Sequence, residues 1–217
     1  MLPFIFFMYC KLLGVFQMKF KILIALFFSL FCFSAWAEES PAPLAMLEKT
    51  SNQLISELKK NQAQIKTDPA VINQLISRIV LPHFDIEGIA RSTIGQGWKQ
   101  ATPAQWSEFK KKVLGLVMKN YSAPLASFDD DQVKFFPMRR FSNDQTQVEV
   151  KSLIIRKNGQ KIPVTYRVFK SGNHWKVSDF SVEGISMVQS YRSQFAPVLS
   201  DGGFNGLLQK LESRKKR

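Results

Sequence analysis

The hydrophobic period of the chain changes twice, and this change limits the possible folds more than any other feature. Apolar residues recur at helical spacing up to Pro124, alternate as in β-strands from Val133 to Val182, and return to helical spacing after Gly184. Asn158-Gly159, between two alternating runs, is a strong type I′ hairpin signal. This order of helices, then strands, then helices predicts an α+β fold, with helices packed over one face of an antiparallel sheet.

The first half of the chain predicts several helices. A stripe runs from Leu47 to Ile65, a second helix opens at Asp68-Pro69 and ends at Pro82, and a short third helix starts at Asp85. The longest helix follows the capping box 102–105 and carries its apolar side at Trp106, Phe109, Val113, Leu116, Val117 and Tyr121.

The alternating region predicts three or four antiparallel strands in meander order. One strand face holds Val148, Val150 and Ile154, the next holds Ile162, Val164, Tyr166 and Val168, and the last strand runs from His174 to Val182. Helical spacing then returns at Ile185, Val188, Tyr191 and Phe195, and Gly202-Gly203 separates this helix from a final one. An apolar cavity between the sheet and the helices is the expected consequence if the core does not close.

The N-terminus reads as an export signal. Lys19 and Lys21 precede an apolar stretch, and Ser34-Ala35-Trp36-Ala37 supplies a small-x-small cleavage site. The segment Ile22–Trp36 is shorter than the roughly 20 residues of a membrane-spanning helix. We expect a cleaved signal peptide at residues 1–37, with the true start at Met18, and a single domain at residues 38–217.

Both cysteines, Cys10 and Cys32, lie in the expected leader. The domain at residues 38–217 therefore has no thiol, so it can form neither a disulfide nor a thiolate metal site. It carries 27 Lys and Arg residues against 17 Asp and Glu residues, a net charge of +10. Because the chain is exported, we expect anionic lipid or acidic protein as partners rather than nucleic acid. A merely soluble basic surface explains the charge equally well.

No motif for catalysis is present. His83 and His174 are the only imidazoles, and their separation gives no metal-binding pattern. The run 129–131 of aspartates lacks the ligand spacing of a calcium loop, and Asp85 with Glu87 is typical of a helix start. We expect no catalytic residue, no metal and no cofactor.

Two adjoining motifs resemble a known family. Val182-Glu183-Gly184-Ile185-Ser186 is followed closely by Tyr191-Arg192-Ser193-Gln194-Phe195, and similar stretches occur at 81–86, 97–98, 105–109 and 162–167. Together they resemble the MlaC / toluene-tolerance Ttg2 family over roughly Ile72 to Leu211. Residues 94–97 depart from the family, which more often has a leucine-rich sequence before a Gly-x-x-Trp motif. This difference is conservative.

The resemblance implies a monomeric periplasmic phospholipid carrier with no catalytic residues. Such carriers shuttle lipid between an outer-membrane lipoprotein–porin complex and an inner-membrane ABC transporter with an MCE ring, and so maintain outer-membrane lipid asymmetry. The bound phospholipid is cargo, with its acyl chains held between sheet and helices and its headgroup facing solvent.

We expect acyl chains to contact residues from three regions, although an ordinary core would explain each of these positions equally well. The sheet side is Tyr166, Val168, Phe180 and Val182; the helix side is Phe84, Ile89, Leu116, Val117 and Tyr121; Met187, Val188 and Tyr191 close one end. Asp179, Glu183 and Arg192 are expected to form a structural salt bridge or cap, with headgroup contact as the alternative. The cations of the tail Arg214–Arg217 either stabilise the C-terminal end of the last helix or dock transiently on anionic lipid or an acidic partner.

Two other functions remain open at this point. One is a periplasmic hydrolase or isomerase on an NTF2-like cone, with Asp179 or His83 as the base. The other is a solvent-tolerance accessory that binds small apolar solutes, which would need no different cavity.

Overall fold

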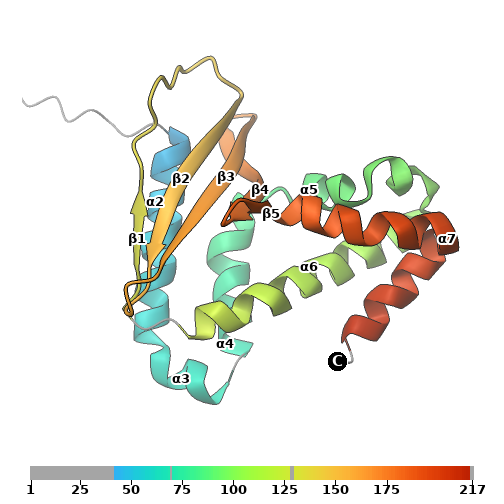
Figure 1. Ribbon diagram of the computed structural model, residues 1–217, viewed down its shortest axis with the longest axis horizontal. Coiled ribbons are helices and arrows are strands. Elements are labelled where there is room, and N and C mark those ends of the chain that lie inside the picture. Colours follow the sequence, from blue (N-terminus) through green and yellow to red (C-terminus); the bar gives the residue numbers. More distant parts are fainter. Residues whose placement is uncertain (1–41, 69, 128–129, 216–217) are drawn as a thin grey trace, which may run out of the picture. The chain divides into compact units, whose positions relative to one another are not determined.

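The structure is a computed structural model that describes residues 42–68, 70–127 and 130–215. For residues 214 and 215 it describes the backbone alone. The leader expected at residues 1–37 and the side chains of the basic tail 214–217 lie outside the described residues. Within the described part, helices precede and follow a single sheet (Figure 1). No described helix has the length and apolar character that crossing a bilayer requires.

In the described part of the chain, helices account for most residues from Ala42 to Ala126. They are α2 (Ala42–Lys60), α3 (Gln62–Thr67), α4 (Ala70–Leu75), α5 (Ile86–Ile94) and α6 (Pro103–Ala126). A π-helical turn at Ile76–Val80 and a 3-10 turn at Leu81–His83 link α4 to α5, and a second 3-10 segment, Gly95–Gln100, links α5 to α6. The last helix, α7 (Met187–Lys215), follows the sheet and bends at Gly203, where φ is +61°.

The expected helix starts are confirmed by their capping bonds. Asp85 accepts a hydrogen bond from the Gly88 N–H at 3.0 Å. The Thr102 hydroxyl accepts from the Gln105 N–H at 3.3 Å, while the Gln105 side chain accepts from the Thr102 N–H at 2.8 Å. These bonds satisfy backbone donors that a helix start otherwise leaves unpaired, and they fix where α5 and α6 begin.

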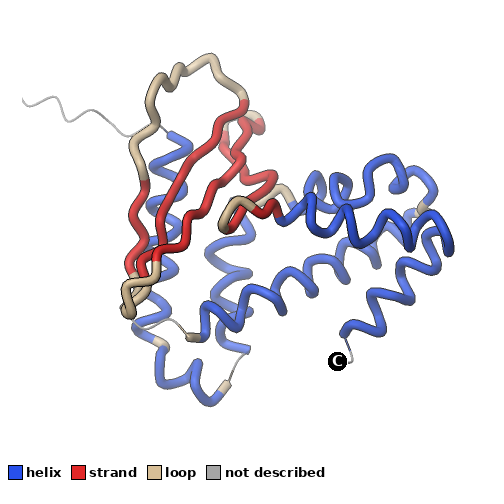
Figure 2. Tube along the Cα trace, viewed as in Figure 1, coloured by secondary structure: helices blue, strands red, loops and turns tan. Residues whose placement is uncertain are grey.

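The sheet is fully antiparallel and its five strands lie in chain order, which confirms the α+β fold class. They are β1 (Gln132–Phe135), β2 (Gln147–Ile155), β3 (Lys161–Ser171), β4 (His174–Val182) and β5 (Ile185–Ser186). Figure 2 shows the strands as one continuous stretch of chain between the helical regions. Antiparallel neighbours joined by tight turns give this meander directly.

One strand and one helix start differ from the expectation. Glu183 and Gly184 both have positive φ, 52° and 83°, so the chain reverses in two residues and Ile185 pairs with Val182. Ile185 therefore belongs to β5 and is 69% exposed, whereas helical spacing had placed it in the helix that precedes Gly202-Gly203. Helix α7 starts only at Met187.

A β-bulge in β4 sets which side chains face the helices. Arg167 of β3 pairs with Asp179, but the next residue, Val168, pairs with Val177, so Ser178 is an extra residue in β4. Side chains alternate in a strand, and one extra residue exchanges the two faces. Val177 on one side of the bulge and Phe180 on the other therefore both face the helices.

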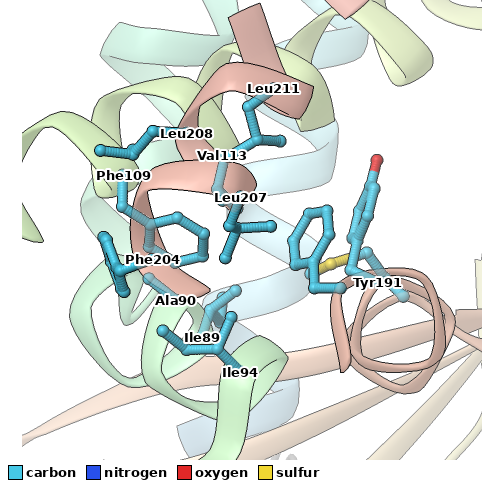
Figure 3. Close-up of a cluster of buried hydrophobic side chains, with 12 residues drawn as sticks. Ile89, Ala90, Ile94, Phe109, Val113, Tyr191, Phe204, Leu207, Leu208 and Leu211 are labelled. Atoms are coloured by element: carbon cyan, nitrogen blue, oxygen red, sulfur yellow. The ribbon is translucent and has the colours of Figure 1, made fainter. Parts of the chain in front are cut away.

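Three groups of buried side chains hold the elements together. The largest joins α5, α6 and α7 around Phe109 and Leu207, both 0% exposed. Figure 3 shows this helical cluster, in which side chains from all three helices interlock. A second group joins α2, α3 and α4, and a third packs Leu44 and Leu47 of α2 against Val150, Val168 and Val177 of the sheet.

Candidate functional site

A cavity of about 460 Å³ lies between the sheet and helices α2, α5 and α6. Its floor is formed by the strands, and its lining is apolar apart from a few residues. The sheet contributes Val133, Ile154, Ile162, Val164, Tyr166, Phe180 and Val182. A volume of this size falls in the range of small-molecule binding sites rather than of packing defects.

The walls of the cavity follow from helical spacing in two helices. Helix α2 turns Ser51, Leu54, Ile55 and Leu58 toward the cavity, and α6 turns Lys110, Val113, Leu114, Val117, Met118, Tyr121, Pro124 and Leu125 toward it. Both sets step by three and four residues, so each forms one continuous stripe along its helix. Two apolar stripes facing an apolar sheet would normally close into a core, and here they leave a space.

Aromatic rings join the floor to the walls. The ring of Phe180 meets the ring of Tyr121 edge-on, with centroids 4.9 Å apart, and the ring of Phe84 at 6.2 Å. Tyr166 stacks with Phe135 at 6.1 Å. Burial raises the pKa of the Tyr121 phenol, with added effects from Tyr191 and Asp179, and burial also raises the pKa of Tyr166. Both phenols are therefore neutral at physiological pH, which suits an apolar ligand.

Four charged residues line the cavity, namely Lys110, Asp131, Arg156 and Glu183, and the first three form ion pairs. Lys110 Nζ lies 2.6 Å from Glu87 Oε2, and Arg156 Nη1 lies 2.7 Å from Asp131 Oδ2. Asp131 also accepts a hydrogen bond from the Lys157 N–H at 3.2 Å. Pairing offsets part of the penalty for charges near an apolar space, because each paired charge keeps a close partner of opposite sign.

Eight of the twelve residues expected to contact a ligand lie around this cavity. They are Phe84, Ile89, Val117, Tyr121, Tyr166, Phe180, Val182 and Met187. Contact of these side chains with a ligand stays a prediction.

The other four expected residues lie elsewhere. Val168 faces the helices but lies beneath Leu44 and Leu47, beyond the end of the cavity. Leu116 and Tyr191 pack in or against the helical cluster, and the Tyr191 hydroxyl accepts a hydrogen bond from Asn120 at 2.8 Å. Val188 packs against that cluster and lines a separate groove outside the sheet. The spacing of apolar residues placed these four on the apolar face of a helix or strand, but it did not show which neighbouring element each one meets.

Helix α2 is the main part of the site that sequence reasoning missed. Its stripe of Leu54, Ile55 and Leu58 was recognised as helical but not assigned to the cavity. The signal was present, because the longest apolar stripe outside α6 has to cover some part of the sheet. Val164, between the predicted positions Tyr166 and Val182 on the floor, was also missed.

Asp179 and His83, the alternative candidates for a base, do not line the cavity. The Asp179 carboxylate accepts from the Ser186 hydroxyl at 2.6 Å and from the Val188 N–H at 3.1 Å, and it caps the start of α7. It lies on the side of β4 opposite the cavity-lining Phe180. Burial lowers the pKa of His83, with Lys49 and Lys176 adding to the effect. In the described part of the chain, no three His, Cys, Asp or Glu side chains could together hold a metal ion.

The fold and the cavity thus define a class: an α+β protein with helices packed over an antiparallel meander and an apolar cavity between the two layers. The family model described as MlaC protein matches residues 48–213. The chain therefore belongs to the MlaC family, as its motifs predicted.

Three known proteins illustrate this relationship. The toluene tolerance protein ttg2D of Pseudomonas putida is 27% identical over 162 residues, 74% of each chain. The intermembrane phospholipid transport system binding protein MlaC of Haemophilus influenzae is 24% identical over 182 residues, which are 82% of this chain and 84% of that protein. A phospholipid-binding protein from Ralstonia solanacearum, solved in complex with a phospholipid, superposes with a TM-score of 0.76 at 29% identity and covers 80% of this chain and 97% of its own.

Proposed function

We propose that this protein is a periplasmic phospholipid carrier and that the cavity between the sheet and α2, α5 and α6 holds the acyl chains of its cargo. The observation that carries the proposal is the cavity itself, about 460 Å³ of apolar space that the adjoining side chains do not fill. The solved relative from Ralstonia solanacearum, described as a complex with a phospholipid, supports the chemical class of the cargo.

The energetics of a carrier fit such a cavity. Burying one methylene group gains about 0.8 kcal/mol, so two acyl chains of ordinary length gain roughly 20–25 kcal/mol over water. A bilayer supplies nearly the same gain, so a carrier needs only to match the membrane. An apolar cavity with few polar groups does this and makes little demand on the headgroup.

The charged pairs bordering the cavity support a shallow position for the headgroup. Both cations of the lining are paired, Arg156 with Asp131 and Lys110 with Glu87, and Glu183 is an anion, so the cavity offers no unpaired cation to bind a phosphate deeply. We infer that the headgroup stays near solvent while the acyl chains enter. The direction of transfer would then come from partners with different affinities for the loaded carrier.

In this proposal the carrier crosses the periplasm after its leader is cleaved. It takes lipid from, or gives lipid to, an outer-membrane lipoprotein–porin complex and an inner-membrane ABC transporter with an MCE ring. The relative from Haemophilus influenzae, named as the binding protein of an intermembrane phospholipid transport system, supports this assignment. The protein would act as a monomer, without a catalytic residue or cofactor.

Native mass spectrometry of the protein purified from its own cells tests the cargo. We expect phospholipid that stays bound under native conditions and is released by denaturation. Protein that carries no lipid would overturn the proposal, and small apolar solutes in place of phospholipid would favour the solvent-tolerance alternative.

A matched pair of variants tests the place of binding. Val117→Trp puts an indole into the cavity from α6 and should lower the bound lipid at least about fivefold, because it fills space the acyl chains need. Gly115→Trp, on the same helix, is the control, since a side chain there starts in open space. Equal lipid content in the two folded variants would show that the cargo binds elsewhere.

A further inference from the structure

A second concavity lies on the other side of β4. This arginine groove, of about 680 Å³, is lined by Arg91, Gly95, Trp98, Arg167, Asp179 and Arg192 among others. It shares no lining residue with the apolar cavity. Asp179 faces the groove and the next residue, Phe180, faces the cavity, so strand β4 separates the two. Cargo in the cavity therefore does not account for the groove.

Three guanidinium groups reach this groove, and each is held from one side. Arg91 lies over the ring of Trp98, with its Cζ 4.4 Å from the centroid, and pairs with Glu87. Arg167 lies 3.4 Å from Glu149 through Nε. Such contacts reduce the freedom of long side chains, so less entropy is lost when a ligand binds them.

Gly95 holds the third guanidinium. A Cβ on Gly95 would lie 3.1 Å from Nη2, 3.6 Å from Cζ and 3.8 Å from Nε of Arg192, so the guanidinium lies against the bare backbone. Gly95 has a φ of +55°, a conformation that other residues rarely adopt. Among the described residues, Arg192 forms no ion pair.

The one acid in the groove is already engaged. Asp179 is 5% exposed, and its carboxylate accepts hydrogen bonds from Ser186 and Val188 at the start of α7. Its nearest guanidinium nitrogen, Arg167 Nη1, is 3.9 Å away, too far for a hydrogen bond. Donors on the three arginines are therefore left for an external anion.

We propose that the arginine groove docks an acidic segment of a partner protein, whose Asp or Glu carboxylates pair with Arg192, Arg167 and Arg91. Guanidinium groups bind carboxylates through paired N–H donors, which gives direction as well as attraction. The groove is concave and admits a protruding chain, whereas the surface of a bilayer is flat. This inference rests on the carrier proposal only in that a carrier has to dock on proteins to load and unload.

The test measures binding of a fluorescein-labelled hexaglutamate peptide to the full chain by fluorescence anisotropy at low ionic strength. We expect Arg192→Gln to weaken binding about fivefold or more, with Arg167→Gln similar. Arg78→Gln is the matched control, because Arg78 is exposed, pairs with Glu57 and lies outside the groove, yet changes the net charge equally. It should change the affinity less than about twofold.

Two further variants separate geometry from charge. Arg192→Lys keeps the charge but loses the paired donors, so its affinity should fall between those of wild type and Arg192→Gln. Gly95→Ala keeps every charge and should also weaken binding, because its Cβ crowds the Arg192 guanidinium and strains the backbone at a φ of +55°. Circular dichroism confirms that each variant is folded before its affinity is compared.

The outcomes distinguish this inference from its rivals and from the carrier proposal. Equal losses in Arg192→Gln and Arg78→Gln would overturn it, since the peptide would then respond only to net charge. Binding to phosphatidylglycerol vesicles that depends on Arg192, without peptide binding, would also overturn it in favour of a membrane surface. Lipid content is measured separately, and Arg192→Gln should keep the wild-type amount.

Discussion

Helix α6 takes part in two regions that use similar residues in different ways. Toward α7 its apolar side chains close completely, with Phe109 at 0% exposed and Leu207 of α7 likewise. Toward the sheet the same helix leaves a cavity of about 460 Å³. Composition does not separate the two regions, because both are lined by Leu, Val, Ile and aromatic rings.

The difference lies in what the facing element can do. Helix α7 bends at Gly203, and this brings Phe204, Leu207 and Leu211 against α5 and α6 (Figure 3). The sheet is fixed by its ladders and cannot approach α6 in the same way, while α2 covers its far end with Leu44 and Leu47. A cavity remains where one side of the interface is too rigid to close it.

The largest expected effect compares two leucines of these regions in lipid-free protein. Leu207→Ala should lower the free energy of unfolding by about 3 kcal/mol, because it opens a hole in a filled cluster. Leu54→Ala, at the cavity wall, should cost roughly 1 kcal/mol, since part of its surface already faces empty space. Urea unfolding followed by circular dichroism measures both. Equal costs would mean that the cavity region is as tightly packed as the helical cluster.

Removal of lipid should affect the two regions differently. At a lipid concentration of 100 times Kd, binding stabilises a protein by about 2.7 kcal/mol, so stripped protein should melt about 5–10 °C lower. Hydrogen exchange should quicken in α2 and in the cavity-facing part of α6, while the cluster around Phe109 keeps its protection. A uniform loss of protection would contradict this division.

Asp179 joins the sheet to α7, so its loss should loosen the connection between the two regions. Asp179→Asn removes the charge that accepts the Ser186 and Val188 hydrogen bonds at the start of α7. We expect a loss of about 1 kcal/mol in unfolding free energy. Asp201→Asn, exposed on the same helix, is the control and should be nearly silent. A silent Asp179→Asn would show that α7 needs no cap from the sheet.

The smallest effect concerns pH. Because burial lowers the pKa of His83 in the folded state, the unfolded chain binds a proton first as the pH falls. The stability that neutral His83 contributes to the folded state is therefore complete above about pH 6.5. It is lost as the pH falls through the lower pKa that His83 has in the folded protein. Thermal melts between pH 7.5 and 5.5 should show a smaller decrease for His83→Gln than for wild type. His174→Gln, at an exposed position, should melt like wild type throughout.

The sequence was sufficient for the elements but not for their contacts. Period changes, caps at Asp85 and Thr102, and the Asn158-Gly159 turn located most helices and strands, because these signals act within a few residues. The family followed from motifs around Gly184 and Tyr191. These are local features, which a single chain displays without reference to its fold.

Assignment to the cavity or to the core depended on distant neighbours. Leu116 and Val117 are adjacent on α6 and both pack against the helical cluster, yet only Val117 also lines the cavity. Nothing in the spacing tells these two faces apart before the positions of α7 and the sheet are known. The sequence indicated the bulge in part. The large apolar residues of β4 occupy odd positions at Trp175 and Val177 and even positions at Phe180 and Val182, so the apolar alternation shifts by one residue between them.

That bulge has a consequence for how this strand can evolve. Because Ser178 is an extra residue, Val177 and Phe180, three positions apart, both face the helices, while Asp179 faces the arginine groove. Deleting Ser178 would leave Val177, Asp179 and Phe180 alternating as in a regular strand, with the carboxylate and the aromatic ring still on opposite faces. The length of β4 can therefore vary at this one position among relatives that keep both surfaces.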